Sequence, residues 1–216
     1  MKPNQQFGQI VILNGAPRSG KSTIAAVIQD TFDGPWMNLG VDIYVREITP
    51  PRYRPGLGLR PGGERQDIEP LVPLFYSALY ETIGVHSRLG LNVVADVGHH
   101  DAYSIRHRIL NHCAQRLSGL PVLFVGVHCS IEAIMERRNQ GQPGRDSQYA
   151  VGSLQDPVPA PVLAWQREVH VPGIYDLVVD TSSTSAERCA DAIRTRLLLE
   201  GAGPTAFEQL ASEILD

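Results

Sequence analysis

The sequence predicts an α/β fold in which helices cover both faces of a parallel sheet. Two observations lead to this prediction. Short apolar runs alternate along the chain with longer segments of helical periodicity, which is the pattern of parallel strands joined by crossover helices. A glycine-rich turn joins the first apolar run to the first helical segment, and folds of this class bind ligands at the carboxyl ends of their strands.

Five strands are expected, and each is a short run rich in apolar or β-branched residues. They cover residues 10–13, 36–41, 92–97, 122–127 and 176–181. Gly15, Asp42, Asp96 and Thr181 stand at the carboxyl ends of four of these runs. Because the carboxyl ends of parallel strands meet at one edge of the sheet, these four residues are expected near one another.

Helices are expected over residues 21–32, 71–90, 104–117, 130–138 and 185–199. Ser130 can cap the fourth helix, and Thr184 with Glu187 predicts a capping box for the fifth. The final segment, 201–216, fits a short acidic helix with Phe207, Leu210 and Ile214 on one face, but it equally fits a frayed end.

Length and composition fit one globular domain. The chain has 216 residues, and we expect one domain over 1–200 with a lid at about 137–161, and a tail at 201–216. No apolar run approaches 18 residues, so no membrane association is expected. A net charge of −4 argues against a nucleic-acid partner. Three widely spaced cysteines fit reduced thiols and a cytoplasmic location.

The glycine-rich turn reads Gly-Ala-Pro-Arg-Ser-Gly-Lys-Ser from Gly15 to Ser22 and matches the phosphate-binding loop pattern G-x-x-x-x-G-K-[ST] without deviation. Glycines let successive N–H groups point at one anion, and the helix that follows adds its positive end. Lys21 is expected to reach the β- and γ-phosphates, and the Ser22 hydroxyl to ligand Mg²⁺. The predicted nucleotide-binding residues are Gly15, Ala16, Pro17, Arg18, Ser19, Gly20, Lys21, Ser22, Thr23 and Thr181.

The rest of the chain favours an ATP-dependent kinase of a small molecule, with residues 1–200 as the P-loop kinase domain and about 43–70 as the acceptor-binding segment. It contains no guanine-specific N-K-x-D motif, so ATP with Mg²⁺ is the expected cofactor pair. Asp42 is the candidate catalytic base, although an aspartate there also fits a helix cap. Asp96 is the candidate second ligand of Mg²⁺, although it also fits a loop cap.

Arginines near the predicted lid are expected to place positive charge beside the transferring phosphoryl group. Arg137 and Arg145 are the candidates, with Arg138 the weaker one, although each also fits a solvated charge. Thr181 either lies beside the adenine or only caps the chain after its strand. His99 and His100 are adjacent on a loop, which is a poor arrangement for one transition metal, so no such site is expected.

The chain resembles the chloramphenicol phosphotransferase-like kinases over roughly residues 9–199. The resemblance rests on Ile12-Leu13-Asn14-Gly15 with its phosphate-binding loop, and on Pro35-Trp36 followed by Gly40-Val41-Asp42. It also rests on Val125-Gly126-Val127-His128-Cys129, on Gly144-Arg145-Asp146, and on His170 followed by Tyr175-Asp176 and Asp180-Thr181.

The resemblance implies a P-loop NTPase fold with five parallel strands and the P-loop strand in the centre. It implies transfer of phosphate from ATP-Mg²⁺ to a primary hydroxyl of a small molecule, with Asp42 as the base. An antibiotic of the chloramphenicol type is one candidate acceptor, but chloramphenicol itself is not inferred as the substrate, because residues 52–65 differ from the family's antibiotic-binding segment. Two features depart from the family pattern: Ala95 stands where a first acidic residue is expected, and a loop carries Arg52, Arg54, Arg60 and Arg65. These arginines favour an anionic acceptor or are solvated surface charges. A zeta-toxin-like nucleotide-sugar kinase and a nucleotide-binding regulatory protein remain alternatives.

Overall fold

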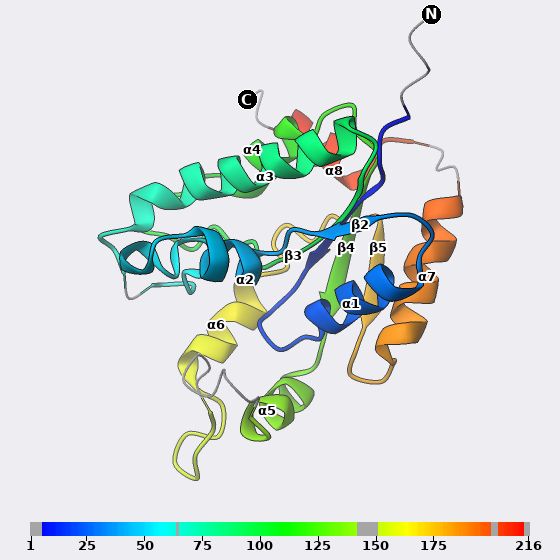
Figure 1. The fold of residues 1–216 in the computed structure, drawn as a ribbon. Helices are drawn as coiled ribbons and strands as arrows, with labels where there is room; N and C mark the ends of the chain where they lie inside the picture. The colour runs from blue at the N-terminus through cyan, green and yellow to red at the C-terminus, as the bar shows by residue number, and fades with distance from the viewer. Residues whose placement is uncertain (1–5, 64, 142–150, 200–202, 214–216) are drawn as a thin grey trace, which may run out of the picture.

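The computed structural model describes residues 6–63, 65–141, 151–199 and 203–213. Its sheet has five parallel strands in the order β2-β3-β1-β4-β5, with β1 in the centre (Figure 1). This confirms the predicted fold class. The strands are β1 (Ile10–Asn14), β2 (Trp36–Asn38), β3 (Asn92–Val97), β4 (Val122–His128) and β5 (Leu177–Asp180).

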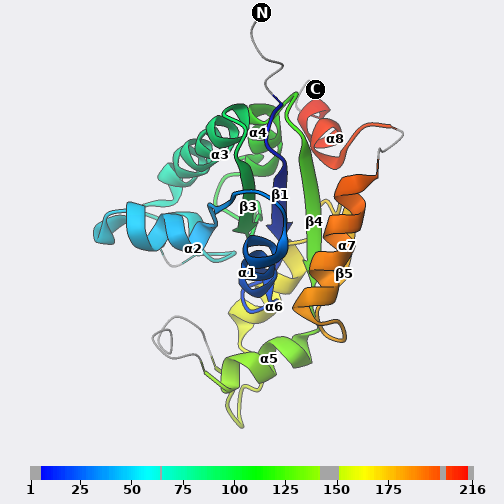
Figure 2. The ribbon, with the colours of Figure 1, turned by 45° about the vertical axis from the view of Figure 1, so that its right-hand side comes forward.

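Helices cover both faces of this sheet. They are α1 (Lys21–Thr31), α2 (Val41–Ile43), α3 (Val72–Arg88), α4 (Ile109–Arg116), α5 (Ile131–Asn139), α6 (Ala160–Glu168), α7 (Ala186–Leu198) and α8 (Ala206–Ser212). Short helical turns at Tyr44–Ile48, Pro51–Tyr53, Gly56–Gly58 and Glu69–Leu71 fill the segment between α2 and α3. This segment lies at the side of the sheet beneath α3, on the left in Figures 1 and 2, whereas α5 and α6 lie at the bottom of both views.

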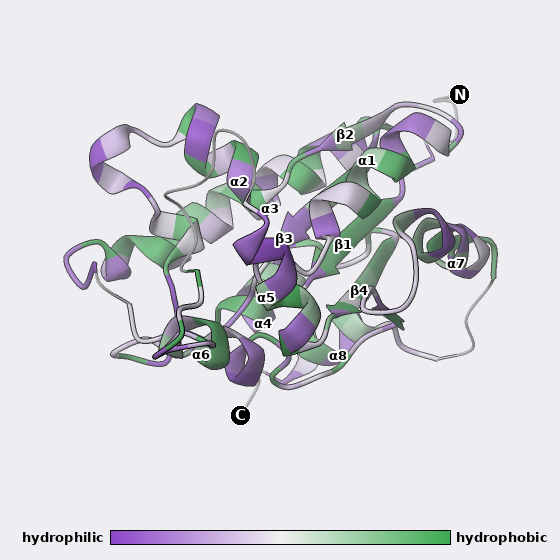
Figure 3. Ribbon diagram, turned by 90° about the horizontal axis from the view of Figure 1, so that it is seen from below, coloured by the Kyte–Doolittle hydropathy of each residue, from purple (hydrophilic) through white to green (hydrophobic). Residues whose placement is uncertain are grey.

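The core has two layers separated by the sheet. On one face, Ile24 and Ile28 of α1 pack with Ile193 of α7 against β1 and β4. On the other face, α3, α4 and α8 bury aromatic and aliphatic side chains such as Tyr80 and Phe207. The central strands β1 and β4 are hydrophobic along most of their length (Figure 3). Burial on both faces explains why these strands read as continuous apolar runs.

Strand pairing brings the predicted site residues to one edge. In register, Leu13 lies beside Asp96 and Asn14 lies beside Val97. The buried Asn14 side chain then fixes this edge, because its Nδ2 donates to the Val169 carbonyl (2.8 Å) and its Oδ1 accepts from the His99 N–H (2.8 Å). Asn14 therefore links the end of β1, where the P-loop begins, to the segments that contain Val169 and His99.

Several element boundaries differ from the sequence prediction. β2 ends at Asn38, and Asp42 lies in the short helix α2 rather than at the end of a strand. The helix expected from residue 104 begins at Ile109, because the Asp101 carboxylate accepts from the N–H groups of His107 and Arg108 and holds a turn there. The cap of α7 is Ser185, one residue after the predicted Thr184.

The tail after residue 202 forms a helix. Thr205 and Glu208 make a complete capping box for α8, and Phe207 and Leu210 are buried. Ile214 lies outside the described residues. None of the described helices combines the length and apolar character that crossing a bilayer requires.

Candidate active site

The phosphate-binding loop connects β1 to α1 and bends through two left-handed residues, Arg18 (φ 73°) and Gly20 (φ 89°). Gly20 is the N-cap residue of α1, and no side chain caps this helix end. An uncapped helix N-terminus with a glycine-rich approach is suited to binding an anion through backbone N–H groups. The predicted strand–loop–helix context of the motif is therefore present.

Lys21 is buried at the floor of the loop. Its Nζ donates to the carbonyl oxygens of Gly15 (2.7 Å) and Ala16 (2.8 Å). Burial lowers the pKa of this ammonium group, while the charges of Asp96 and Asp42 act in the opposite direction. The two carboxylates therefore compensate the cost of holding a cation in a buried position.

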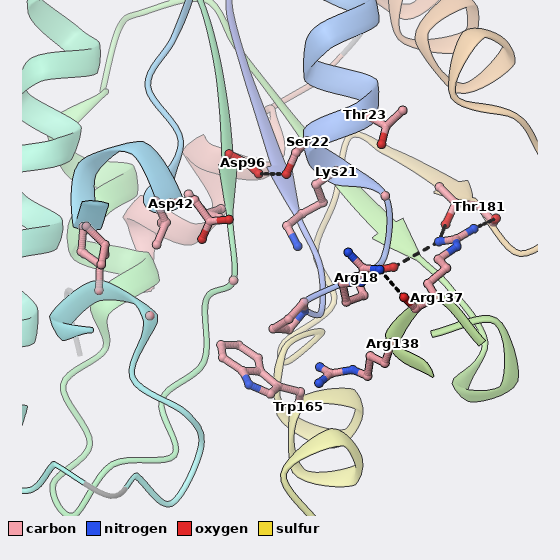
Figure 4. Close-up of a pocket in the computed structure, with 18 of the residues that line it drawn as sticks. Arg18, Lys21, Ser22, Thr23, Asp42, Asp96, Arg137, Arg138, Trp165 and Thr181 are labelled. Carbon is pink, nitrogen blue, oxygen red and sulfur yellow. Dashed lines mark hydrogen bonds between the residues drawn. The ribbon is translucent and has the colours of Figure 1, made fainter. Parts of the chain in front are cut away.

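Ser22 and Asp96 meet across the gap between α1 and β3. The Ser22 hydroxyl donates to Asp96 Oδ2 at 2.7 Å, and both side chains face the same cavity (Figure 4). Gly40 makes this position of Asp96 available, because a Cβ built on Gly40 would lie 1.7 Å from Asp96 Oδ1. A hydroxyl and a carboxylate oxygen so placed are the ligand types that Mg²⁺ prefers.

Asp42 reaches the same cavity from α2. It belongs to the first turn of this short helix, whose N-cap residue is Gly40. The alternative prediction that Asp42 caps this helix is therefore wrong, because the N-cap residue lies two positions earlier. Its exposed side chain lines the cavity with Lys21 and Asp96 (Figure 4).

Thr181 holds the loop from the opposite side. Its hydroxyl donates to the Ser19 carbonyl (2.7 Å), and its own carbonyl accepts from Arg137 Nη2 (2.6 Å). Arg137 Nη1 also donates to the Arg18 carbonyl (3.2 Å), and Arg18 Nη2 donates to the carbonyls of Arg137 and Gly141. The two arginines and Thr181 thus connect the P-loop, β5 and α5.

The cavity has a volume of about 900 Å³. Of the predicted nucleotide-binding residues, Pro17, Arg18, Gly20, Lys21, Ser22, Thr23 and Thr181 line it. Gly15, Ala16 and Ser19 belong to the loop but are buried and do not line the cavity. Asp42, Asp96 and Arg137 also line the cavity, whereas Arg145 lies outside the described residues.

Other lining residues were missed or underrated by the sequence prediction. Arg138 is only 5% exposed and faces the cavity from α5, close to Trp165 of α6 in the view of Figure 4. Its spacing from the buried Ile134 is one helical turn, so periodicity could have placed it on the inward face of α5. No local pattern marked Trp165, because α6 follows a segment rich in glycine and proline.

The wall opposite the P-loop comes from the segment after β2. It includes Val45, Arg46, Arg54, Leu57 and Arg60. This wall lies within the predicted acceptor-binding segment, 43–70.

The histidines near the site have partners within the protein. His99 Nε2 lies 2.7 Å from the Tyr80 hydroxyl, and burial lowers the pKa of His99 to about 3. His100 Nε2 lies 2.7 Å from the Leu59 carbonyl. His170 stacks on His128 with ring centroids 3.9 Å apart, and burial, with the charges of His128 and Lys21, lowers its pKa to about 4. Among the described residues, no group of three or more His, Cys, Asp or Glu side chains is arranged to hold a metal ion.

Solved structures with the same architecture include small-molecule and nucleotide kinases. A shikimate kinase from Acinetobacter baumannii matches with a TM-score of 0.55 at 12% identity, covering 89% of this chain and 94% of its own. The APS kinase of Mycobacterium tuberculosis, in complex with AMPPNP and APS, matches with a TM-score of 0.54 at 15% identity and coverages of 88% and 98%. Thymidylate kinase from Candida albicans gives 0.53 at 17% identity, with coverages of 88% and 90%. At these identities the likeness shows the fold alone.

Sequence relatives point to a narrower group. A Mycobacterium tuberculosis protein named "Putative O-phosphotransferase" is 26% identical over 197 residues, which cover 85% of this chain and 79% of the relative. The model of the family described as "Chloramphenicol phosphotransferase-like protein" matches residues 8–198, which include the P-loop, Asp42, Asp96 and Thr181. The chain therefore belongs to the chloramphenicol phosphotransferase-like family of proteins.

Proposed function

We propose that this protein transfers the terminal phosphoryl group of ATP, in the presence of Mg²⁺, to a hydroxyl group of a small molecule. One observation carries the proposal: Lys21, Ser22, Asp42 and Asp96, from three separate segments, line a single cavity at the carboxyl edge of the sheet. Phosphoryl transfer needs a phosphate cradle, a metal site and a base that share one space. Membership of a phosphotransferase-like family supports the same reading.

The P-loop would hold the triphosphate. Its N–H groups and Lys21 bind the phosphate oxygens, for which the Nζ must leave the carbonyls of Gly15 and Ala16. Ser22 and Asp96 would hold Mg²⁺, and the donor set fits because Mg²⁺ is commonly bound by one or two carboxylates together with substrate phosphates and water. The metal ion, when bound, neutralises charge on the transferring group.

Asp42 would accept the proton of the attacking hydroxyl. The position of Asp42 supports this role, because its carboxylate lines the same cavity as Lys21 and Asp96. Arg137, Arg138 and Arg145 would supply positive charge to the transferring group, and residues 137–161 would act as the lid that excludes water. Trp165, which closes the cavity from α6, adds an apolar surface to that exclusion.

Two variants separate binding from transfer. Lys21→Ala is expected to weaken binding of magnesium nucleotide about 10-fold or more, since one charge-assisted contact is removed. Asp42→Asn is expected to keep nucleotide affinity and to lower kcat by about 10²–10⁴-fold, the usual contribution of a general base. Calorimetry with Mg²⁺ and AMPPNP, and ADP release with a panel of hydroxylated acceptors, measure the two effects.

The acceptor panel should contain chloramphenicol, a nucleotide sugar and small alcohols. If no acceptor raises ADP release above the rate with water, the transferase proposal fails and a slow nucleotide switch takes its place. If Asp42→Asn leaves transfer unchanged, the assignment of the base is wrong. Unchanged nucleotide affinity in Lys21→Ala would remove the P-loop from the proposed binding mode.

A further inference from the structure

We propose that the hydroxyl acceptor is an organic anion, whose carboxylate or phosphate group is bound by Arg54 and Arg60 on the wall formed by residues 41–60. The inference rests on the proposed function and names the chemical class of its second substrate. It follows from which arginines of this segment face the cavity, how they are held, and the charge balance of the cavity lining.

The arginines of the segment divide into two groups. Arg54 and Arg60 line the cavity. Arg65 does not line it, and its guanidinium instead holds Asp67 through two contacts of 2.8 Å. Arg52 is exposed and lies over the ring of Tyr53, 4.7 Å from its centroid. The reading of these arginines as solvated surface charges therefore does not fit the two that face the cavity.

Arg54 is oriented by neutral contacts. Its Nε donates to the Thr49 carbonyl at 2.7 Å, and its own carbonyl accepts from Arg65 Nη1 at 3.3 Å. Thr49 is itself buried and donates its hydroxyl to the Tyr44 carbonyl. A carbonyl fixes the direction of a guanidinium without neutralising its charge, and the planar Nη groups suit bidentate binding of a carboxylate or phosphate.

The charge balance of the lining leaves room for a second anion. The described lining residues include seven cations, Arg18, Lys21, Arg46, Arg54, Arg60, Arg137 and Arg138, and two carboxylates, Asp42 and Asp96. The formal charges of these lining residues therefore sum to +5, which favours anionic ligands. Three of the cations, Arg46, Arg54 and Arg60, lie on the wall opposite the P-loop, and Arg46 is paired there with Glu47 at 2.6 Å.

The same wall places the anion and the reacting hydroxyl within one molecule. The turn Gly56–Gly58 packs against α2, which carries Asp42. The same segment also contributes apolar residues to the wall, with Leu57 only 2% exposed and Val41 and Val45 also lining the cavity. An acceptor with a hydroxyl at one end, an anionic group at the other and a carbon skeleton between them matches this surface.

Matched pairs of acceptors test the proposal. Each pair consists of a hydroxy acid, or a hydroxylated phosphate monoester, and a neutral partner in which the acid is an amide or methyl ester. The wild-type protein is expected to show a kcat/KM at least about 10-fold higher for the anionic member, because hydrogen bonds to a charged group add that much discrimination. Carboxylates and phosphates form separate arms, so the preferred anion is also identified.

Arg54→Gln is expected to raise KM for the anionic member about 10- to 100-fold while leaving kcat and the neutral member little changed. Arg60→Gln tests the second cation in case the first variant fails to fold. Arg52→Gln is the matched control, since it removes an arginine from the same loop but not from the cavity. Equal preference for the neutral members, or equal effects of Arg54→Gln and Arg52→Gln, would overturn the proposal.

Direct binding separates this inference from the proposed function. The same acids are titrated calorimetrically into the wild-type protein, both with and without saturating Mg²⁺ and AMPPNP. Binding that favours the anionic members and is lost in Arg54→Gln supports the inference even where no phosphate is transferred. If the protein phosphorylates only neutral acceptors, the proposed function stands but the inference of an anionic acceptor is refuted. Failure of every acid to bind under both conditions also refutes the anionic acceptor.

Discussion

At residue 40, one missing carbon atom decides where the Asp96 carboxylate can lie. Gly40 has an ordinary extended backbone (φ −67°), so an alanine would cause no backbone strain. Its Cβ, however, would overlap Asp96 Oδ1 at 1.7 Å and approach Cγ at 2.9 Å. Gly40 therefore leaves space for the Asp96 carboxylate of β3 and also forms the N-cap of α2.

Gly40→Ala is expected to displace the Asp96 carboxylate and break its contact with Ser22. Loss of an oriented ligand typically weakens metal affinity 10- to 100-fold, so the Mg²⁺ concentration for half-maximal activity should rise by about that factor. A magnesium titration of ADP release measures it, with the thermal unfolding midpoint recorded to show that the variant is folded. An unchanged magnesium requirement would mean that Asp96 does not contribute to the metal site.

His99 gives the folded protein a pH dependence. Burial, with a smaller contribution from the charge of His100, lowers its pKa from 6.5 to about 3. Between these values the unfolded chain binds a proton that the folded chain does not, so the free energy of unfolding falls as the pH drops from 6.5 toward 3. One such group contributes a slope of up to about 1.4 kcal/mol per pH unit.

Replacement of His99 should remove this slope. His99→Gln is expected to be less stable than the wild type at pH 7, where the contact with Tyr80 is weakened, but to lose less stability between pH 6.5 and 4. Urea unfolding at several pH values measures the difference. His112→Gln, at an exposed position, is the control and should keep the wild-type slope. Parallel pH profiles for wild type and His99→Gln would contradict the assignment.

At the scale of elements, the ends of the helices depend on contacts that the sequence pattern only partly shows. Ser130 caps α5 as predicted, by accepting from the Ala133 N–H. At α7 the predicted cap Thr184 is wrong by one residue, because Ser185 caps the helix by accepting from the Arg188 N–H. The start of α4 depends on Asp101, whose carboxylate accepts a hydrogen bond from the N–H of His107, six residues further along the chain. A propensity pattern does not contain such medium-range contacts.

The capping box of α8 yields a prediction at this scale. Thr205 Oγ1 accepts from the Glu208 N–H (3.2 Å), and Glu208 Oε2 accepts from the Thr205 N–H (2.7 Å). Thr205→Ala is expected to lower the free energy of unfolding by about 1 kcal/mol. Ser212→Ala, at the other end of the helix and exposed, should change it by less than about 0.5 kcal/mol. Equal effects of the two variants in denaturant unfolding would show that the cap has no special role.

At the scale of the whole molecule, α8 completes the core on one face of the sheet. Phe207 packs edge-to-face on Phe124 of β4 with centroids 5.0 Å apart, and it stacks with Tyr80 of α3 at 6.3 Å. Asp176 joins the same assembly, since its carboxylate accepts from the N–H groups of Ala206 and Phe124. Residues distant in sequence are thereby held in one cooperative unit.

Phe207→Ala is therefore expected to destabilise the entire fold by about 3–5 kcal/mol, the usual cost of emptying a buried phenylalanine site. The unfolding should remain a single transition when followed by circular dichroism and by tryptophan fluorescence. Leu198→Ala, at a residue 80% exposed on α7, is the control and should have little effect. A separate early transition, with the main one unshifted, would show instead that α8 undocks independently.

The sequence by itself determined the fold class, the order of the five strands and of the longer helices between them, and the phosphate-binding loop, but not the helices α2 and α6. These features are written in local signals: strand and helix periodicities, and glycines where the backbone turns. Only the tertiary structure decided which charges share the cavity: Arg54 and Arg138 face it, Arg65 is held by Asp67, and Gly40 gives space to Asp96. Most of these relations, such as that of Gly40 with Asp96, join residues tens of positions apart, and their distances are fixed by how the segments pack rather than by any pattern within one segment.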